Sequence, residues 1–232
     1  MYNANGNSLM SDTPAVKNII IFTGIIYASQ MFAPSLNITQ LGALHYFKSP
    51  DFKPYQLVTA MFLHGSFMHL LFNMLTLFFF GTMLERYWGS KRFLFFYLAC
   101  GIGASVIEQF AIPFLAQKFA NGYVLPDGIA ASIAEIKVAY QNRYSSLGAS
   151  GAIMGLLAAF AYLFPNTPMY LMFLPIPIKA KYMVGIYILI DVFGGFSSLQ
   201  GDNIAHFAHL GGALCGFIIV LFWNKTNRRT FY

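Results

Sequence analysis

The sequence predicts an all-α membrane protein with six spans. Of its 232 residues, 57% are hydrophobic and only 9% are charged, whereas soluble domains carry about a quarter charged residues. Mean hydropathy is +0.59, and six apolar runs approach the length that a helix needs to cross a bilayer. These runs are 18–34, 66–84, 93–116, 149–164, 182–197 and 203–223.

The connections and tails complete this organisation. The fourth and fifth apolar runs are short and are interrupted by proline, glycine or aspartate. The connection 35–65 mixes aromatic residues, prolines and charges, which predicts that it lies partly in the membrane interface. The connection 117–147 is polar and is expected outside the membrane. We expect a polar tail over 1–16 without signal-peptide features, a six-span domain over 17–224, and a short basic tail over 225–232.

Lysines and arginines predict the orientation. Nine of them fall on one face of the predicted bundle, close to span ends, and five fall on the other. Because basic residues concentrate on the cytoplasmic side, both termini are expected in the cytoplasm. The net charge is +6. Because the basic residues lie at span ends, where they contact anionic lipid, this charge does not indicate nucleic acid as a partner. The cysteines, Cys100 and Cys215, lie in apolar segments and suggest no disulfide framework.

Under this topology, the second, fourth and sixth spans all begin at the outer face, and polar residues gather there. Polar side chains in hydrocarbon are costly and are functional candidates. A serine and a histidine at matched depth suggest a nucleophile and its base. The residues at this depth are His64, His69, Asn73, Ser150, His206 and His209.

Glycines mark one face of the fourth span and one face of the sixth. Gly151 and Gly155 follow Ser150, and Gly212 and Gly216 follow His209, in both cases four residues apart. Such spacing allows two helix backbones to approach closely in lipid. Close packing of these two spans would bring the serine to the histidine.

The second span offers hydrogen-bond donors for an oxyanion. His69 and Asn73 stand one helical turn apart on one face, and the backbone N–H of Ser150 is a third candidate. Other interpretations stay open: the serine and glycines are packing devices, or single histidines are satisfied by backbone carbonyls. A metal site is a further alternative, although no cysteine or well-placed carboxylate accompanies its four candidate ligands, His64, His69, His206 and His209.

Together these motifs resemble the rhomboid intramembrane serine proteases. The resemblance covers roughly 40–223 and rests on His64-Gly-Ser-Phe-Met-His69-Leu-Leu-Phe-Asn73, Gly-Ala-Ser150-Gly-Ala-Ile-Met-Gly155 and Ala-His209-Leu-Gly-Gly212-Ala-Leu-Cys-Gly216, with Glu85-Arg86 and Gly89 after the second span. It implies a six-helix rhomboid-type bundle and a Ser–His dyad. In that dyad Ser150 is the nucleophile and His209 the general base, because only His209 satisfies the pattern His-x-x-Gly-x-x-x-Gly. It also implies an oxyanion hole made by His69, Asn73 and the Ser150 amide.

The resemblance further implies what the protein acts on. Its substrates would be transmembrane proteins, cut in or beside their membrane-spanning segments within the lipid bilayer, without a metal or organic cofactor. We expect it in a bacterial cytoplasmic membrane, with the site opening toward the outer face. The alternative is a catalytically inactive protein of the same fold that binds membrane proteins, against which the presence of both Ser150 and His209 argues.

The fifth span and the glycine-rich segment 194–201 are predicted to form a lateral gate for substrate. In this hypothesis Phe193 and Phe196 pack against the second span. His206 lies nearer the outer mouth, where it touches substrate or water.

Four positions depart from the family pattern or stand outside it. Tyr55-Gln56 replaces a Trp-Arg pair common in the first external connection, and Met154 occupies a position where some members have tyrosine. Asp191, inside the fifth span, has two interpretations. It is a third catalytic member, or its carboxylate faces a water-filled mouth or a hydroxyl on a neighbouring helix.

Overall fold

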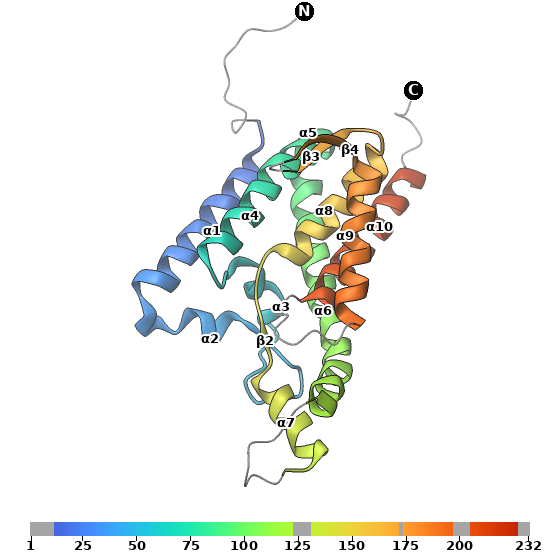
Figure 1. Cartoon of the computed structure of the whole chain (residues 1–232). Coiled ribbons are helices and arrows are strands. Elements are labelled where there is room, and N and C mark those ends of the chain that lie inside the picture. The colour runs from blue at the N-terminus through green and yellow to red at the C-terminus, as the bar shows by residue number, and fades with distance from the viewer. Residues whose placement is uncertain (1–11, 123–130, 172–173, 197–204, 227–232) are drawn as a thin grey trace, which may run out of the picture.

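The structure is a computed structural model that describes residues 12–122, 131–171, 174–196 and 205–226, and most of them are helical. The longer helices run side by side as one bundle (Figure 1). Among the described residues, four helices are long and apolar enough, by length and composition, to cross a membrane. They are α1 (Pro14–Phe32), the stretch Phe67–Trp88, α6 (Ser90–Gly122) and α10 (His206–Thr226).

The fourth and fifth apolar runs form the shorter helices α8 (Ser150–Leu163) and α9 (Ala180–Phe196). Each of the six runs therefore contains a helix, while the count of six membrane crossings remains a prediction. The beginning of α1 and the end of α10 lie at the same end of the bundle (Figure 1). The first turns of α4, α8 and α10 all lie toward the opposite end.

The second span is one continuous stretch with an irregular centre. It consists of α4 (Phe67–Thr76), a π-helical turn (Leu77–Gly81) and α5 (Thr82–Trp88). The side chain of Ser66 caps it by accepting a hydrogen bond from the N–H of His69. This cap fixes where the helix begins, at Phe67, two residues before His69.

Helix α1 begins at Pro14, so the predicted tail over 1–16 extends three residues too far. The carboxylate of Glu85, at the end of the second span, accepts hydrogen bonds from the N–H groups of Ala15 (2.9 Å) and Val16 (2.8 Å). These N–H groups have no partner inside their own helix, and a carboxylate is favourable at a helix N-terminus. Glu85 is 1% exposed and also accepts from the hydroxyl of Ser90.

Both long connections contain regular structure that the sequence did not predict. Helix α6 continues to Gly122, six residues past the predicted end of its span. The polar connection then forms α7 (Ile133–Arg143), which begins with a capping box between Ser132 and Glu135. The first connection contains α2 (Ile38–Gly42), β1 (Leu44–His45) and α3 (Gln56–Thr59), with short 3-10 turns before α2 and after α3.

The fold contains two small antiparallel pairs of strands. One joins segments distant in sequence, and the other joins neighbouring segments. Strand β1 pairs with β2 (Ser145–Ser146), with Leu44 opposite Ser146. Strands β3 (Pro168–Leu171) and β4 (Leu174–Lys179) pair beside α5, at the other end of the bundle (Figure 1). The β1–β2 pair ties the connection 35–65 to the segment that leads into α8.

Gln56 anchors the first connection through its side-chain amide. It is 1% exposed, and its amide donates to the carbonyls of Leu41 and Asp51, both at 3.1 Å. Its oxygen accepts from the N–H groups of His45 and Lys53. One amide side chain thus satisfies four backbone groups in a connection built from short elements.

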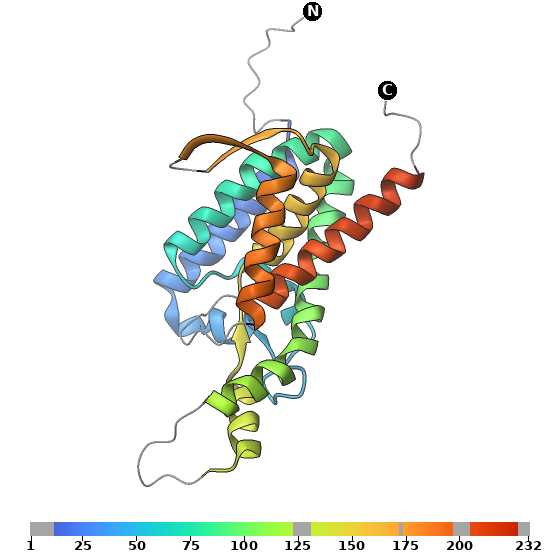
Figure 2. The same cartoon turned by 45° about the vertical axis from the view of Figure 1, so that its right-hand side comes forward.

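Helix α8 is the centre of the bundle. Every residue from Gly151 to Phe160 is buried, which is typical of a helix that is apolar on all sides. Helices α6, α9 and α10 all contact it, and α9 stands at the front beside α10 in Figure 2. Large apolar side chains on the outer helices face outward instead, among them Phe22, Phe110 and Phe222.

Candidate active site

Ser150 is the first residue of α8 and is presented by a tightly held loop. Just before it, the N–H of Gly148 donates to the carbonyl of Ala60 at 2.9 Å. Gly148 has a φ of +131°, and a Cβ there would lie 2.9 Å from Nε2 of His69. Only glycine fits both this backbone conformation and the approach of the imidazole. The same hypothetical Cβ would lie 3.8 Å from Ser150 Oγ, so the His69 ring and the serine hydroxyl both lie close to Gly148.

Helices α8 and α10 meet backbone to backbone through the predicted glycine faces. A Cβ at Gly212 would overlap the carbonyl oxygen of Gly151, and one at Gly216 would lie 2.5 Å from the carbonyl oxygen of Gly155. The prediction of close packing between these spans is therefore confirmed. This contact sets the separation between Ser150 and α10.

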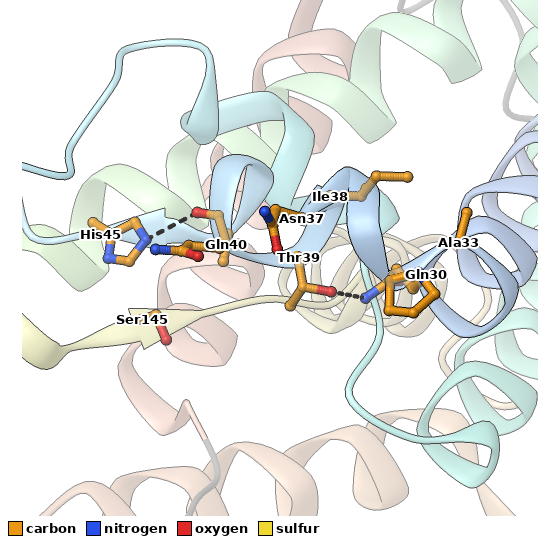
Figure 3. A pocket seen from close by; sticks show the side chains of 10 residues that line it. Gln30, Ala33, Asn37, Ile38, Thr39, Gln40, His45 and Ser145 are labelled. Atoms are coloured by element: carbon orange, nitrogen blue, oxygen red, sulfur yellow. Dashed lines mark hydrogen bonds between the residues drawn. The ribbon is translucent and has the colours of Figure 1, made fainter.

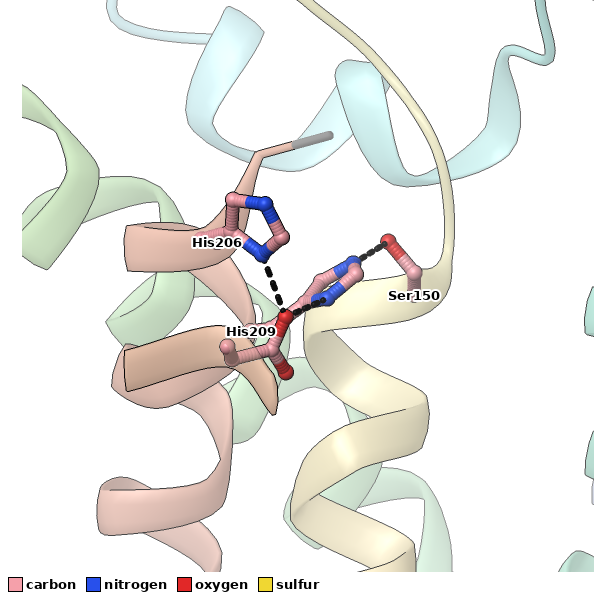
Figure 4. A network of polar contacts seen from close by, with 4 residues as sticks. Ser150, His206 and His209 are labelled. Atoms are coloured by element: carbon pink, nitrogen blue, oxygen red, sulfur yellow. Dashed lines mark hydrogen bonds and ion pairs between the residues drawn. The ribbon is translucent and has the colours of Figure 1, made fainter. Parts of the chain in front are cut away.

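His209 reaches Ser150 across this interface. Its Nε2 lies 2.8 Å from Ser150 Oγ, within hydrogen-bond distance. Figure 4 shows the ring between the serine hydroxyl on one side and a carboxylate oxygen on the other. The histidine side chain is 19% exposed, so it is shielded but not sealed from water.

The carboxylate belongs to Asp191 of α9, and its neighbours are two imidazoles. Its Oδ1 lies 2.8 Å from Nδ1 of His206 and 3.0 Å from Nδ1 of His209. Asp191 is 5% exposed. Its contacts among the described residues are imidazoles. The interpretation in which it contacts a hydroxyl on a neighbouring helix therefore does not fit the structure.

His206 lines the same cavity as Ser150, and its expected contact with substrate or water stays a prediction. His206 is 7% exposed and its ring faces Asp191 (Figure 4). The physical reason is helical spacing: residues three apart lie on the same face, so His206 and His209 both face α9.

Candidate oxyanion donors border the same cavity as the serine. The cavity has a volume of about 880 Å³, and its lining includes His69, Asn73, Ser150 and His209. Asn73 is 7% exposed, and its Nδ2 has no hydrogen-bond partner in the described part of the chain. A buried amide donor without a partner is costly and calls for an explanation. The N–H of Ser150, in the first turn of α8, has no partner within its helix.

A second buried carboxylate supports the loop before Ser150. Glu108 of α6 accepts hydrogen bonds from the hydroxyls of Tyr144 and Ser146, each at 2.7 Å. Burial, and then the adjacent Glu108, raise the pKa of Tyr144 well above its usual value. Glu108 thus holds β2, four residues before Ser150. Sequence analysis did not assign this role, because no local pattern links residue 108 to residues 144 and 146.

The four histidines considered as metal ligands form two separate pairs. The rings of His64 and His69 lie 5.0 Å apart, and those of His206 and His209 lie 6.5 Å apart. Within the described ranges, no three His, Cys, Asp or Glu side chains converge in a way that could hold a metal ion. Burial lowers the pKa of His64 to about 4, and neighbouring His69 adds to this effect, so His64 is neutral at pH 7.

The aromatics of the predicted gate are exposed, and Phe196 contacts helices other than the expected one. Phe193 is 72% exposed. The Phe196 ring, 62% exposed, packs against Phe114 of α6 and Phe207 of α10. The expectation that Phe196 packs against the second span is therefore wrong. Ser197, Ser198 and Gly201, also included in the predicted gate, lie outside the described residues.

A second cavity, of about 390 Å³, lies between the end of α1, α2 and the β1–β2 pair (Figure 3). Five of its ten lining residues carry an amide or hydroxyl side chain. Gln30 donates to Thr39 at 2.8 Å, and His45 contacts the carbonyl of Gln40. Figure 3 shows these two contacts, and neither Ser150 nor His209 lines this cavity.

Comparison with known proteins gives one consistent result. Residues 51–225 match the Rhomboid domain. The chain is 30% identical to RHOMBOID-like protein 12, mitochondrial, of Arabidopsis thaliana over 179 residues. This match covers 75% of this chain and 47% of the relative. It is 32% identical over 164 residues to the rhomboid protease GluP of Bacillus subtilis, covering 70% and 25%.

A third relative is the rhomboid protease AarA of Providencia stuartii, 30% identical over 207 residues, covering 86% of this chain and 66% of the relative. The chain spans about half the length, or less, of the first curated relatives that it matches. The similarity covers the residues that surround the cavity.

Proposed function

The chain belongs to the rhomboid family, a family that includes membrane proteases, and on this premise we propose that it is an intramembrane serine endopeptidase. The observation that carries the proposal is the 2.8 Å distance between His209 Nε2 and Ser150 Oγ, at the border of a cavity with an unpartnered amide donor. A nucleophile, a base within hydrogen-bond reach and oxyanion donors are what acyl transfer requires.

In the proposed reaction, His209 accepts the proton of Ser150 through Nε2 while Oγ attacks the carbonyl carbon of the substrate. The carbonyl oxygen becomes an oxyanion that receives hydrogen bonds from Asn73, His69 and the Ser150 amide. The C–N bond then breaks, and His209 gives its proton to the leaving amine. A water molecule attacks the acyl carbon, again losing a proton to His209, and Ser150 regains its hydrogen as the acid leaves.

This chemistry needs water and a substrate that lies in the membrane. The exposed fraction of His209 and the polar residues in the lining of the 880 Å³ cavity, among them Ser145 and Ser146, support access by water from the end of the bundle that holds β1 and β2. We infer six membrane crossings over 17–224 with both termini cytoplasmic, so that the site opens toward the outer face. The substrates would be transmembrane segments of other proteins.

We infer that such substrates approach beside α9. This helix carries exposed aromatic side chains, Phe193 and Phe196, on the outside of the bundle next to the helix that bears His209. Bulky apolar side chains on a surface suit contact with lipid or with an apolar substrate helix. The relatives include mitochondrial proteins of Arabidopsis and yeast. We therefore propose a membrane location without naming the membrane, because these relatives do not support the expected bacterial cytoplasmic membrane.

The decisive experiment is Ser150→Ala, assayed on a transmembrane substrate in liposomes with a chelator present. The change should lower the rate by about 10⁶-fold, since removal of one member of such a pair is about as damaging as removal of both. A fluorophosphonate probe should label the wild-type serine and leave the variant unlabelled. The rival function, an inactive binding protein, predicts no cleavage and no labelling in either form. Cleavage by Ser150→Ala, or cleavage abolished by the chelator, would contradict the proposal.

A further inference from the structure

Asp191 extends the proposed Ser–His pair in a way that the family resemblance does not imply. Its Oδ1 lies within hydrogen-bond distance of Nδ1 of both His206 and His209, while Nε2 of His209 lies against Ser150. The four groups form one chain of contacts across α8, α10 and α9 (Figure 4). The carboxylate itself does not line the cavity that holds the serine.

The donor and acceptor inventory of these groups determines where the protons lie. A carboxylate only accepts hydrogen bonds, so each imidazole that contacts it must carry a proton on Nδ1. In a neutral ring, a proton on Nδ1 leaves Nε2 with a free lone pair. The Nε2 of His209 therefore meets Ser150 as an acceptor, which is the form that a general base requires.

Packing holds the carboxylate in this place. Gly194, one helical turn after Asp191, has no side chain, and a Cβ there would overlap the His206 ring. The imidazole of His206 can therefore lie close to the backbone of α9 and reach the carboxylate. His206 and His209 share one oxygen, so His206 holds Asp191 at the position where it meets His209.

We propose that Asp191 is a positioning residue for the reaction: it fixes the Nδ1–H tautomer of His209 and stabilises the ring when Nε2 takes the serine proton, and His206 holds its carboxylate in place. This inference rests on the proposed function. No proton passes to Asp191; the proton on Nδ1 stays there throughout, and the serine proton moves to Nε2 and on to the leaving amine.

The first test is the near-isosteric change Asp191→Asn, compared with wild type for kcat, KM and melting temperature. An asparagine can donate to Nδ1 and so favour the unproductive tautomer, which lowers kcat on the order of 10²- to 10⁴-fold in a comparable arrangement. KM should change little, because the side chain does not touch substrate. An unchanged kcat in a folded variant, or a rise in KM alone, would overturn the proposal.

Double substitution separates this role from simple packing. His206→Gln should lower kcat less than Asp191→Asn does, and the double variant should be no slower than Asp191→Asn alone, because His206 acts through the carboxylate. Additive losses would overturn the role of His206. If Ser150→Ala is inactive while Asp191→Asn keeps full kcat, the proposed function survives and this inference fails. If Ser150→Ala is active, the proposed function itself fails.

A spectroscopic test does not depend on the folding of any Asp191 variant. Nitrogen NMR of the protein labelled at its five histidines reports which ring nitrogen carries the proton, and the signal missing in His209→Gln identifies His209. The expected result in wild type is protonated Nδ1 and bare Nε2. A proton on Nε2 of neutral His209 would overturn the proposal.

Discussion

Helix α10 meets its neighbours in two different ways. Against α8 the contact is between backbones, with the glycines at 212 and 216 set directly on the carbonyls of 151 and 155. Against α9 it is made by side chains: a carboxylate between two imidazoles, and a cluster of rings that leaves Phe196 62% exposed. The first side leaves no room for adjustment, and it carries the serine. The second side carries the carboxylate proposed to position His209, and its outer part is an exposed cluster of rings.

This difference predicts that small changes on the α8 side cost much activity, while larger ones on the α9 surface cost little. Outside the Ser150–His209–Asp191 chain of contacts, the largest effect is expected at Asn73, which lines the same cavity. Asn73→Ala should lower kcat by about 100- to 1000-fold, or roughly 3–4 kcal/mol, with a smaller change in KM. Asn73→Asp should be no better, because a carboxylate cannot donate to an oxyanion.

Asn224→Ala is the matched control, because Asn224 bonds to the Tyr162 hydroxyl at the far end of α10. It should leave kcat unchanged. A rise in KM with unchanged kcat for Asn73→Ala would assign Asn73 to substrate docking instead.

A single methyl group tests the contact between α8 and α10. Gly212→Ala puts a Cβ where the carbonyl oxygen of Gly151 lies, so the helices must separate. Overpacking costs about 1–3 kcal/mol of stability, and a displacement of the catalytic groups of about 1 Å costs roughly 100-fold in rate. Rate and melting temperature should both fall.

Gly185→Ala on α9 is the control for this change, because nothing lies within 4 Å of its hypothetical Cβ. It should be neutral or slightly stabilising. Equal effects of the two alanines would remove the distinction between the two sides.

On the α9 surface, Phe196→Ala should raise the rate a few-fold for a transmembrane substrate. The change removes the contacts of this ring with Phe114 and Phe207, and so loosens α9 where substrate is proposed to approach. A short soluble peptide should gain much less, and Phe193→Ala, at a more exposed ring, should change little. A lower rate for both substrates at an unchanged melting temperature would place Phe196 in the substrate-binding surface.

The smallest effect on catalysis is expected at His64, which lies off both sides of α10. His64→Gln should leave kcat unchanged and alter only how stability depends on pH. The unfolded chain protonates this residue near pH 6.5, but the folded protein does not until about pH 4. Wild type should therefore lose stability as the pH falls from 6.5 toward 4.

Melting temperatures measured across that pH window should fall more steeply for wild type than for His64→Gln. The His69 ring faces residue 64 in both proteins, so its own titration largely cancels in the comparison. Parallel curves would show that His64 does not contribute.

The same two sides show what the sequence could predict. The glycine faces at 151, 155, 212 and 216 are patterns within single helices, so their contact was predictable. The partners of Asp191 were not, because they depend on how α9 is rotated against α10, which no local pattern records. The support of Glu108 for β2 and the anchoring by Gln56 join residues distant in sequence in the same way. The prediction that Phe196 packs against the second span was wrong for the same reason.

The bond between Glu85 and the start of α1 has a consequence for synthesis. The carboxylate stands 70 residues after the N–H of Ala15 that it accepts from. During translation the first helix therefore leaves the ribosome long before its cap exists, and its terminal N–H groups must rely on water or lipid headgroups until the second span arrives. Because the chain is made from its N-terminus, α1 can complete its docking only after the second span, which carries Glu85, has been inserted.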